Sequence, residues 1–179
     1  MAEFSQKERT GSYIEEQRLN QPWVKVLMGG VVVAAWAGVL LQLSFAESFG
    51  NNLTTWSMIA IGVIAGGVLP LWVLSVRLVV EVRPDRLVYK YVGLHRNWHE
   101  ISWDDVAHFY GRRYKPIREY GGWGIRFGKG GKAYNAKGEH GVQLVMRDGE
   151  RVLFGSQEPE RFVAAIEEAT GRKASKPDD

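Results

Sequence analysis

The sequence predicts a hairpin of two membrane-spanning helices, followed by a small all-β domain that one C-terminal helix closes. Three features carry this prediction: two apolar runs without charged residues, a stretch in which apolar and polar residues alternate, and a last segment with apolar residues at helical spacing. The chain has 179 residues, enough for one compact domain and a small additional element. It contains no cysteine, which excludes disulfides and thiolate chemistry.

The two apolar runs, residues 26–46 and 56–76, each contain twenty-one residues without Asp, Glu, Lys, Arg or His. As helices they would each extend about 31 Å, the thickness of the hydrocarbon core of a bilayer. They predict a transmembrane hairpin over residues 23–76, with the lipid bilayer as its surroundings. Because neither run holds an ionisable side chain, a proton relay or a path for charged substrates is not expected.

Basic residues lie on one side of this hairpin only. The connection 47–55 carries no Lys or Arg, whereas nine basic residues flank the outer ends of the two runs: Lys7, Arg9, Arg18, Lys25, Arg77, Arg83, Arg86, Lys90 and Arg96. Cytoplasmic flanks of membrane helices are enriched in Lys and Arg. The asymmetry therefore predicts a multi-pass protein of the cell (inner) membrane with both termini in the cytoplasm.

Residues 1–22 are predicted to be a cytoplasmic segment and not a cleaved signal peptide. The segment is polar, contains four glutamates and lacks a compact basic region. The sequence Ser12-Tyr-Ile-Glu15 fits a capping box, which predicts a short amphipathic helix through Arg18 and Leu19 at the membrane surface.

Small residues recur within both runs and indicate close helix packing. Gly30, Ala34 and Gly38 are spaced by four residues in the first run, as are Gly62 and Gly66 in the second. Such small-residue faces allow either close packing of the two helices within one hairpin or association between copies of the chain. The sequence does not distinguish these alternatives. Pro70 is expected to kink the second helix.

Residues 77–171 read as a small β domain closed by a helix. The runs 77–82 and 86–93 flank the turn Arg83-Pro-Asp85, and the segments 94–103 and 104–114 predict a third and a fourth strand. The segment 141–156 alternates about Asp148-Gly149 and predicts a hairpin. Pro159, an apolar face and Gly171 then mark a helix, capped by Ser156 or Gln157. Residues 172–179 are charged and are predicted to be a disordered tail.

About seven strands followed by one amphipathic helix is the order of elements in a pleckstrin-homology-like (PH-like) barrel. The chain also resembles bacterial two-span membrane proteins with a cytoplasmic PH-like domain, a family without an assigned activity. The resemblance rests on the stretches "EEQRLNQPW", "YGGWGIR" and "KAYNAKGEHGVQLVMRDGERVLFGSQEPERFVAAI". It implies a PH-like fold, and it carries over no catalytic residue.

Residues 120–134, "YGGWGIRFGKGGKAY", hold six glycines and three basic residues. A phosphate-binding loop would need G-x-x-x-x-G-K-[ST] before a helix, and a dinucleotide fingerprint would need a strand, turn and helix. This stretch matches neither pattern. We expect Gly121, Gly122 and Gly124 to let a strand bulge around Trp123, and the later glycines to form a loop.

A basic cluster just before the glycines is the candidate binding surface. Its residues are Arg112, Arg113, Lys115 and Arg118, with Tyr120 and Trp123 as candidate aromatic anchors. Such a surface would bind a protein partner or a second copy of the chain. The alternative is an anionic-lipid-sensing surface of a homo-oligomeric membrane protein, because basic residues near a bilayer are attracted to acidic headgroups.

Other chemistry finds little support in the sequence. His95 and His99 lack the carboxylate motif of a zinc protease, and Asp104, Asp105 and His108 lack a nucleophile to activate. The net charge is only +3, with acids and bases interspersed, so nucleic-acid binding is not expected. We therefore predict a membrane-anchored interaction module that is not an enzyme and uses no metal, cofactor or small-molecule substrate.

Overall fold

The computed structural model describes residues 13–19, 21–44, 52–128 and 130–176. The chain forms two compact units, each described separately below. One unit is residues 19–76, and the other combines residues 1–18 with residues 77–179.

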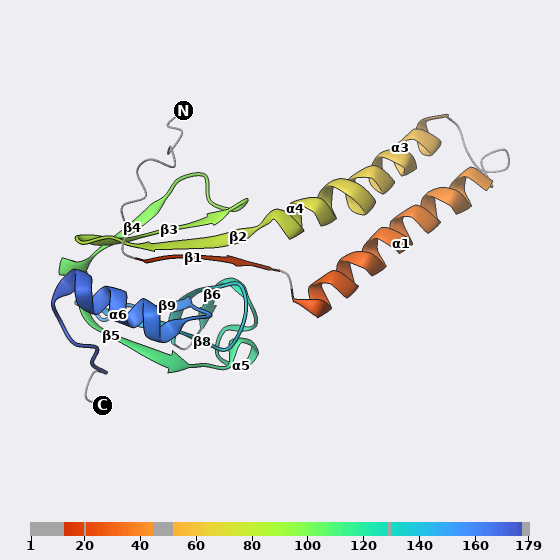
Figure 1. Ribbon diagram of the computed structural model, residues 1–179. Coiled ribbons are helices and arrows are strands. Elements are labelled where there is room, and N and C mark those ends of the chain that lie inside the picture. Colours follow the sequence, from red (N-terminus) through yellow and green to blue (C-terminus); the bar gives the residue numbers. More distant parts are fainter. Residues whose placement is uncertain (1–12, 20, 45–51, 129, 177–179) are drawn as a thin grey trace. The chain divides into compact units, whose positions relative to one another are not determined.

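The first unit is a helical hairpin (Figure 1). Helix α1 (Pro22–Ser44) lies beside a second helix built from α3 (Asn52–Val63), the π-helical turn η2 (Ile64–Val68) and α4 (Leu69–Ser75). Both helices are long and apolar enough to cross a membrane. Only 11% and 17% of their most apolar windows are buried, whereas a core helix of a soluble protein would be covered on most sides.

Pro70 explains the π-helical turn in the second helix. Proline has no N–H to donate to the carbonyl four residues earlier, and its ring pushes against that turn. The carbonyl of Gly66 is the one left without this donor, and the indole N–H of Trp36 lies 3.4 Å from it. The expected distortion at Pro70 is therefore a wider turn at Ile64–Val68, with partial compensation from α1.

The two small-residue faces behave differently. A Cβ atom added to Gly62 or Gly66 would overlap side chains of α1, those of Val39 and Trp36. These two glycines thus permit the close approach of the helices within the hairpin. By contrast, nothing lies within 4 Å of a Cβ added to Gly30 or Gly38, and Ala34 is exposed. The face formed by Gly30, Ala34 and Gly38 does not pack in this hairpin.

The described residues of the second unit form nine strands in two sheets. The first sheet has the order β1-β2-β3-β4, all antiparallel, and the second has the order β5-β8-β9-β7-β6 with β7 and β9 parallel. Their bounds are β1 Tyr13–Arg18, β2 Arg77–Val82, β3 Arg86–Val92, β4 His99–Ser102, β5 Val106–Arg113, β6 Gly124–Gly128, β7 Gly131–Asn135, β8 His140–Met146 and β9 Arg151–Gly155.

Strand β1 replaces the helix expected before the first apolar run, and that prediction was wrong. Tyr13 to Arg18 pairs residue by residue with Val82 to Arg77 of β2. Burial alternates along β1, with Tyr13 and Gln17 buried and Glu16 exposed, which is the period of a strand and not of a helix. The partner strand lies about sixty residues away in the sequence, so a local capping pattern could not reveal it.

The first hairpin, the Asp-Gly hairpin and the C-terminal helix were predicted correctly. β2 and β3 flank the turn at Arg83, while β8 and β9 flank Asp148-Gly149. β4 is shorter than the predicted segment, and β1 and β7 raise the number of strands above the seven expected. Within the described residues no strand pairing joins the two sheets, so they do not form a closed barrel.

Helix α6 (Pro159–Thr170) packs against both sheets, contacting β1 and β2 of one sheet and β5 and β8 of the other. Its buried residues are Phe162, Ala165 and Ile166, and Gly171 ends it in the left-handed conformation. Its N-cap residue is Glu158 and not Ser156 or Gln157, so the predicted cap was wrong. The Ser156 hydroxyl instead accepts a hydrogen bond from the N–H of Glu158. Phe162 stacks on Tyr13 at 5.2 Å between ring centroids, which ties the helix to β1.

The segment 172–176, predicted as part of a disordered tail, lies along β5. Ser175 N–H donates to the carbonyl of Phe109 at 3.0 Å. The Arg172 guanidinium donates to the carbonyl of Val106 at 2.7 Å and lies over the Phe109 ring. The segment is therefore held by a side-chain donor and a backbone donor, which bind carbonyl groups on the free edge of β5. Its charged composition did not predict this ordered structure. Residues 177–179 lie outside the described residues.

Candidate functional site

Three of the predicted basic residues converge on the outer face of the second sheet. Arg112 is the next-to-last residue of β5, Lys115 directly precedes the short helix α5 (Pro116–Tyr120), and Arg118 lies within that helix. This helix covers a cluster of buried residues, Tyr114, Tyr120, Ala133 and Leu153. Pro116 at the first position of α5 and Gly121 in the left-handed conformation at its end fix the turn.

Arg112 is held rigidly and is only partly available to a ligand. Its guanidinium donates to Glu119 Oε2 at 2.9 Å, to Tyr120 Oη at 3.0 Å and to Gln143 Oε1 at 3.1 Å. Burial alone would lower the pKa of the Arg112 guanidinium. The interaction with Tyr120 and the hydrogen bond that Arg112 donates to Glu119 have the larger, opposite effect and raise this pKa. The other oxygen of Glu119 accepts Lys115 N–H at 2.7 Å, so this carboxylate is already neutralised.

Around Arg112 lie two adjoining hollows that share Glu119 and Gly130; together we call them the basic hollow. One measures about 440 Å³ and the other about 550 Å³. Glu119 is the one acidic residue among the described residues that line them. The remaining lining residues are Tyr110, Gly111, Arg112, Lys115, Arg118, Gln143, Arg151 and Lys176.

The free positive charge of the basic hollow comes from three side chains. Lys115, Arg118 and Arg151 are exposed, and within the described part of the chain none of them forms an ion pair. Long basic side chains without an acidic neighbour create a positive potential that attracts anions. Arg151 comes from β9, and no signal in the sequence distinguishes it from other exposed strand residues.

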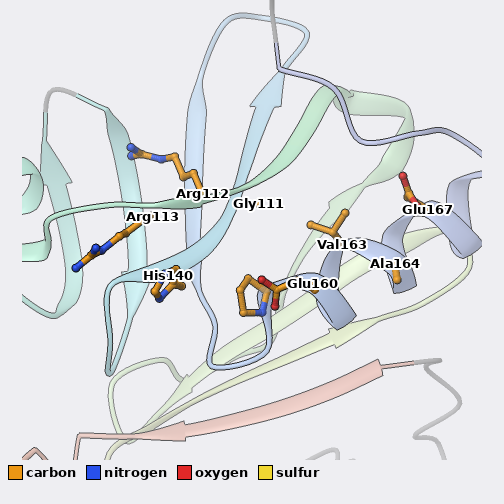
Figure 2. Close-up of a pocket in the computed structure, with 9 residues that line it drawn as sticks. Gly111, Arg112, Arg113, His140, Glu160, Val163, Ala164 and Glu167 are labelled. Carbon is orange, nitrogen blue, oxygen red and sulfur yellow. The ribbon is translucent and has the colours of Figure 1, made fainter.

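On the opposite face of β5 lies a groove of about 460 Å³ between the strand end and α6, which we call the α6 groove (Figure 2). Gly111 and Val163 form its apolar floor together with Ala164. Basic Arg113 and the neighbouring His140 line its sheet side, and acidic Glu160 lines its helix side. Arg113 also pairs with exposed Glu139 at 2.7 Å, and its hydrogen bonds lower the pKa of that carboxyl.

The two candidate aromatic anchors are placed differently from the basic residues. Tyr120 is only 3% exposed and belongs to the cluster under α5. Trp123 is half-buried, and its indole N–H donates to the carbonyl of Gly138 at 3.0 Å. Both rings support the fold of the glycine-rich stretch, and neither projects from the surface.

The glycine-rich stretch itself forms α5's end, β6, a turn and β7. Gly131 has φ +94°, and a Cβ there would overlap the carbonyl oxygen of Arg151. A Cβ on Gly128 would overlap the carbonyl oxygen of Glu119. Close approach of neighbouring backbone therefore accounts for these two glycines. The expected strand bulge around Trp123 was wrong, because β6 begins only at Gly124 and pairs with β7 in regular register.

His95, between β3 and β4, and His99 in β4 come together with 4.4 Å between ring centroids. Tyr89 stacks on His99, and its hydroxyl lies 3.2 Å from that of Tyr134. Within the described residues, no three His, Asp or Glu side chains gather where they could hold a metal ion. This cluster thus joins the two sheets through aromatic contacts.

A scan against models of known families finds no match to the chain, and no curated protein matches its sequence.

Proposed function

We propose that this protein is a membrane-anchored interaction module, in which a PH-like β unit is held at the cytoplasmic face of the membrane by a two-span hairpin. Two long, largely exposed apolar helices support the anchor. The basic residues that flank them support the orientation. Two antiparallel-rich sheets with a C-terminal helix against both support a PH-like architecture that is open between the sheets.

The basic hollow carries the proposed binding role. Arg112 and Arg151 line one of its two adjoining hollows, and Lys115 and Arg118 line the other. The two hollows share Glu119 and Gly130. Since Glu119 is already bound by Arg112 and Lys115 N–H, the hollow keeps a net positive charge. A matching ligand surface carries carboxylates, and the partner is therefore a protein with an acidic segment.

The test is crosslinking and affinity capture of the full-length protein from its native membrane, followed by mass spectrometry. Three forms are compared: the wild type, the double variant Lys115→Glu/Arg118→Glu, and Arg96→Glu. Arg96 is an exposed basic residue between β3 and β4, outside the hollow, so it controls for a change of charge alone. The proposal predicts one reproducible protein that is recovered with the wild type and Arg96→Glu and lost with the double variant.

Two results would contradict this function. Identical recovery with all three forms would exclude the basic hollow as the binding surface. Recovery of only the protein itself with co-purified anionic lipid, lost with the double variant, would instead support the lipid-sensing alternative.

A further inference from the structure

The outer edge of β5 presents backbone groups without partners. β5 is the last strand of its sheet, and in an antiparallel ladder the N–H and C=O of alternate residues point toward the partner strand and away from it. Tyr114 N–H donates across the ladder to the carbonyl of Glu139 at 2.8 Å. The alternation therefore turns the backbone groups of Gly111 and Arg113 outward. Within the described residues neither has a hydrogen-bond partner there.

The chain's own tail covers only the first part of this edge. Ser175 N–H bonds to the carbonyl of Phe109, two residues before Gly111. Among the residues that the structure describes, none pairs with the edge of β5 from Gly111 onward.

This open edge lies between the two surfaces already described. Gly111 lines both the basic hollow and the α6 groove. In a strand added beside β5, successive side chains would point to opposite faces of the sheet. One set would enter the basic hollow beside Arg112 and Arg151, where carboxylates fit. The other set would meet Val163 and Ala164, where small apolar groups fit.

A second copy of the chain is a poor occupant. If two β5 edges paired antiparallel, with the outward groups of Gly111 in one copy opposite those of Arg113 in the other, Arg112 of one copy would face Arg112 of the second. Like charges opposite each other destabilise a strand pair. An acidic segment meets no such repulsion.

We propose that the edge of β5 at Gly111 and Arg113 is a docking site for an extended acidic segment of a partner protein, which adds a strand to the sheet. Main-chain hydrogen bonds would supply affinity, and the two flanking surfaces would select alternating acidic and small apolar side chains. This inference rests on the proposed interaction function and specifies its partner.

Two variants at Gly111 separate the contribution of its backbone N–H to peptide binding from the effect of adding a side chain. Gly111→Pro removes the outward N–H, and proline is tolerated on edge strands where that group faces solvent. Gly111→Ala keeps the N–H, and its Cβ would lie 3.5 Å from Val163 Cγ2, an ordinary contact. Near-ultraviolet circular dichroism of both full-length variants checks that they remain folded.

The probe is a fluorescent, end-blocked peptide of alternating Glu with Val or Ala, titrated onto the full-length protein in lipid nanodiscs. Wild type and Gly111→Ala should bind it with similar affinity, and Gly111→Pro should bind about tenfold more weakly or not at all. A peptide N-methylated at alternate backbone nitrogens should bind none of the three. Residue-resolved hydrogen exchange should show protection of the amides of Gly111 and Arg113 on binding.

Absence of peptide binding to the wild type, equal binding to Gly111→Pro and Gly111→Ala, or binding of the N-methylated peptide would each overturn the inference. The capture experiment distinguishes a failure of the strand-addition inference from a failure of the proposed interaction function. If Lys115→Glu/Arg118→Glu loses the captured protein and Gly111→Pro retains it, the interaction function stands and strand addition is wrong. If neither variant loses it, the proposed function itself fails.

Discussion

His95 lies in the aromatic cluster that contacts both sheets, and its surroundings shift its ionisation. Its Nδ1 accepts the backbone N–H of Tyr91 at 3.2 Å, which requires that nitrogen to be unprotonated. Burial lowers the pKa of His95, and the positive charges of His99, Lys132 and Lys90 lower it further. The folded protein therefore favours the neutral imidazole.

This lowered pKa predicts a loss of stability in mild acid. An unfolded histidine titrates near about pH 6.5, so below that pH the unfolded chain binds more protons than the folded one, and stability falls as pH falls. We expect the melting temperature to decrease between about pH 7.5 and about pH 5.5, and His95→Asn, which keeps an acceptor for Tyr91 N–H, to flatten that decrease. His140→Asn on the exposed side is the control. An unchanged slope in His95→Asn would contradict this assignment.

Gly131 and Gly121 offer a matched test of why the stretch is rich in glycine. Both have positive φ, but a Cβ on Gly131 would overlap the Arg151 carbonyl, whereas nothing lies within 4 Å of one on Gly121. We predict that Gly131→Ala lowers the free energy of unfolding by at least about 2 kcal/mol, and Gly121→Ala by about 1 kcal/mol from backbone strain alone. Thermal unfolding of the full-length variants in detergent measures both. Equal losses would mean that the close approach at Gly131 is not stabilising.

At the scale of elements, β1 is held to the end of β9 by one carboxylate. Glu15 accepts hydrogen bonds from the Tyr13 hydroxyl at 2.5 Å and the Ser156 hydroxyl at 2.6 Å. It also accepts Gln157 N–H at 2.7 Å and the Gln17 amide at 3.0 Å. The Gln17 amide also donates to the carbonyl of Gly155 at 2.5 Å. These contacts attach the N-terminal strand to residues more than 130 positions away in the sequence.

Removing this carboxylate should loosen β1. Glu15→Ala leaves partly buried donors without an acceptor, and we expect it to lower the free energy of unfolding by about 2–3 kcal/mol. Glu16→Ala on the exposed face of the same strand removes only surface ion pairs with Arg18 and Arg77, worth less than about 1 kcal/mol. Hydrogen exchange of the β1 amides should rise in Glu15→Ala alone. Equal stability of the two variants would show that the cluster at Glu15 does not hold the strand.

The elements that sequence analysis found are those with local signals. The Asp148-Gly149 turn and the alternation on either side define β8 and β9, and Pro159 with Gly171 bounds α6. β1 was missed because its inward-facing residues, such as Gln17, are polar and find their partners only in the folded unit. The parallel pairing of β7 with β9 likewise has no local signature.

Only the part of the candidate site whose residues are close in sequence could be predicted. Lys115 and Arg118 form a visible basic cluster with Arg112, and the structure brings these three together. Arg151 joins them from a distant strand, while Tyr120 is buried by the short helix that the sequence analysis did not anticipate. Whether residues from separate elements lie close together depends on the topology of the fold, which residue spacing alone does not reveal.

At the scale of the whole molecule, the β unit is connected to both ends of the helical hairpin. β1 ends at Arg18 shortly before α1, and β2 begins at Arg77 directly after α4. Arg18 and Arg77 are opposite each other in the β1–β2 ladder. The chain therefore leaves the sheet at the end of β1 and returns to it at the start of β2, at the same end of this strand pair. If both helices cross a membrane, as we propose, these two connections require the β unit to lie on one side of it.

The most direct measurement of this arrangement is single-cysteine labelling of the full-length protein, which has no native cysteine. Lys137→Cys places a thiol on the exposed surface of the β unit, and Ser48→Cys places one in the connection between the two apolar runs. The account predicts that a membrane-impermeant maleimide labels position 48 in intact cells and position 137 only in inverted membrane vesicles. Labelling of position 137 from outside intact cells, or of both positions from the same side, would contradict a cytoplasmic module anchored by two spans.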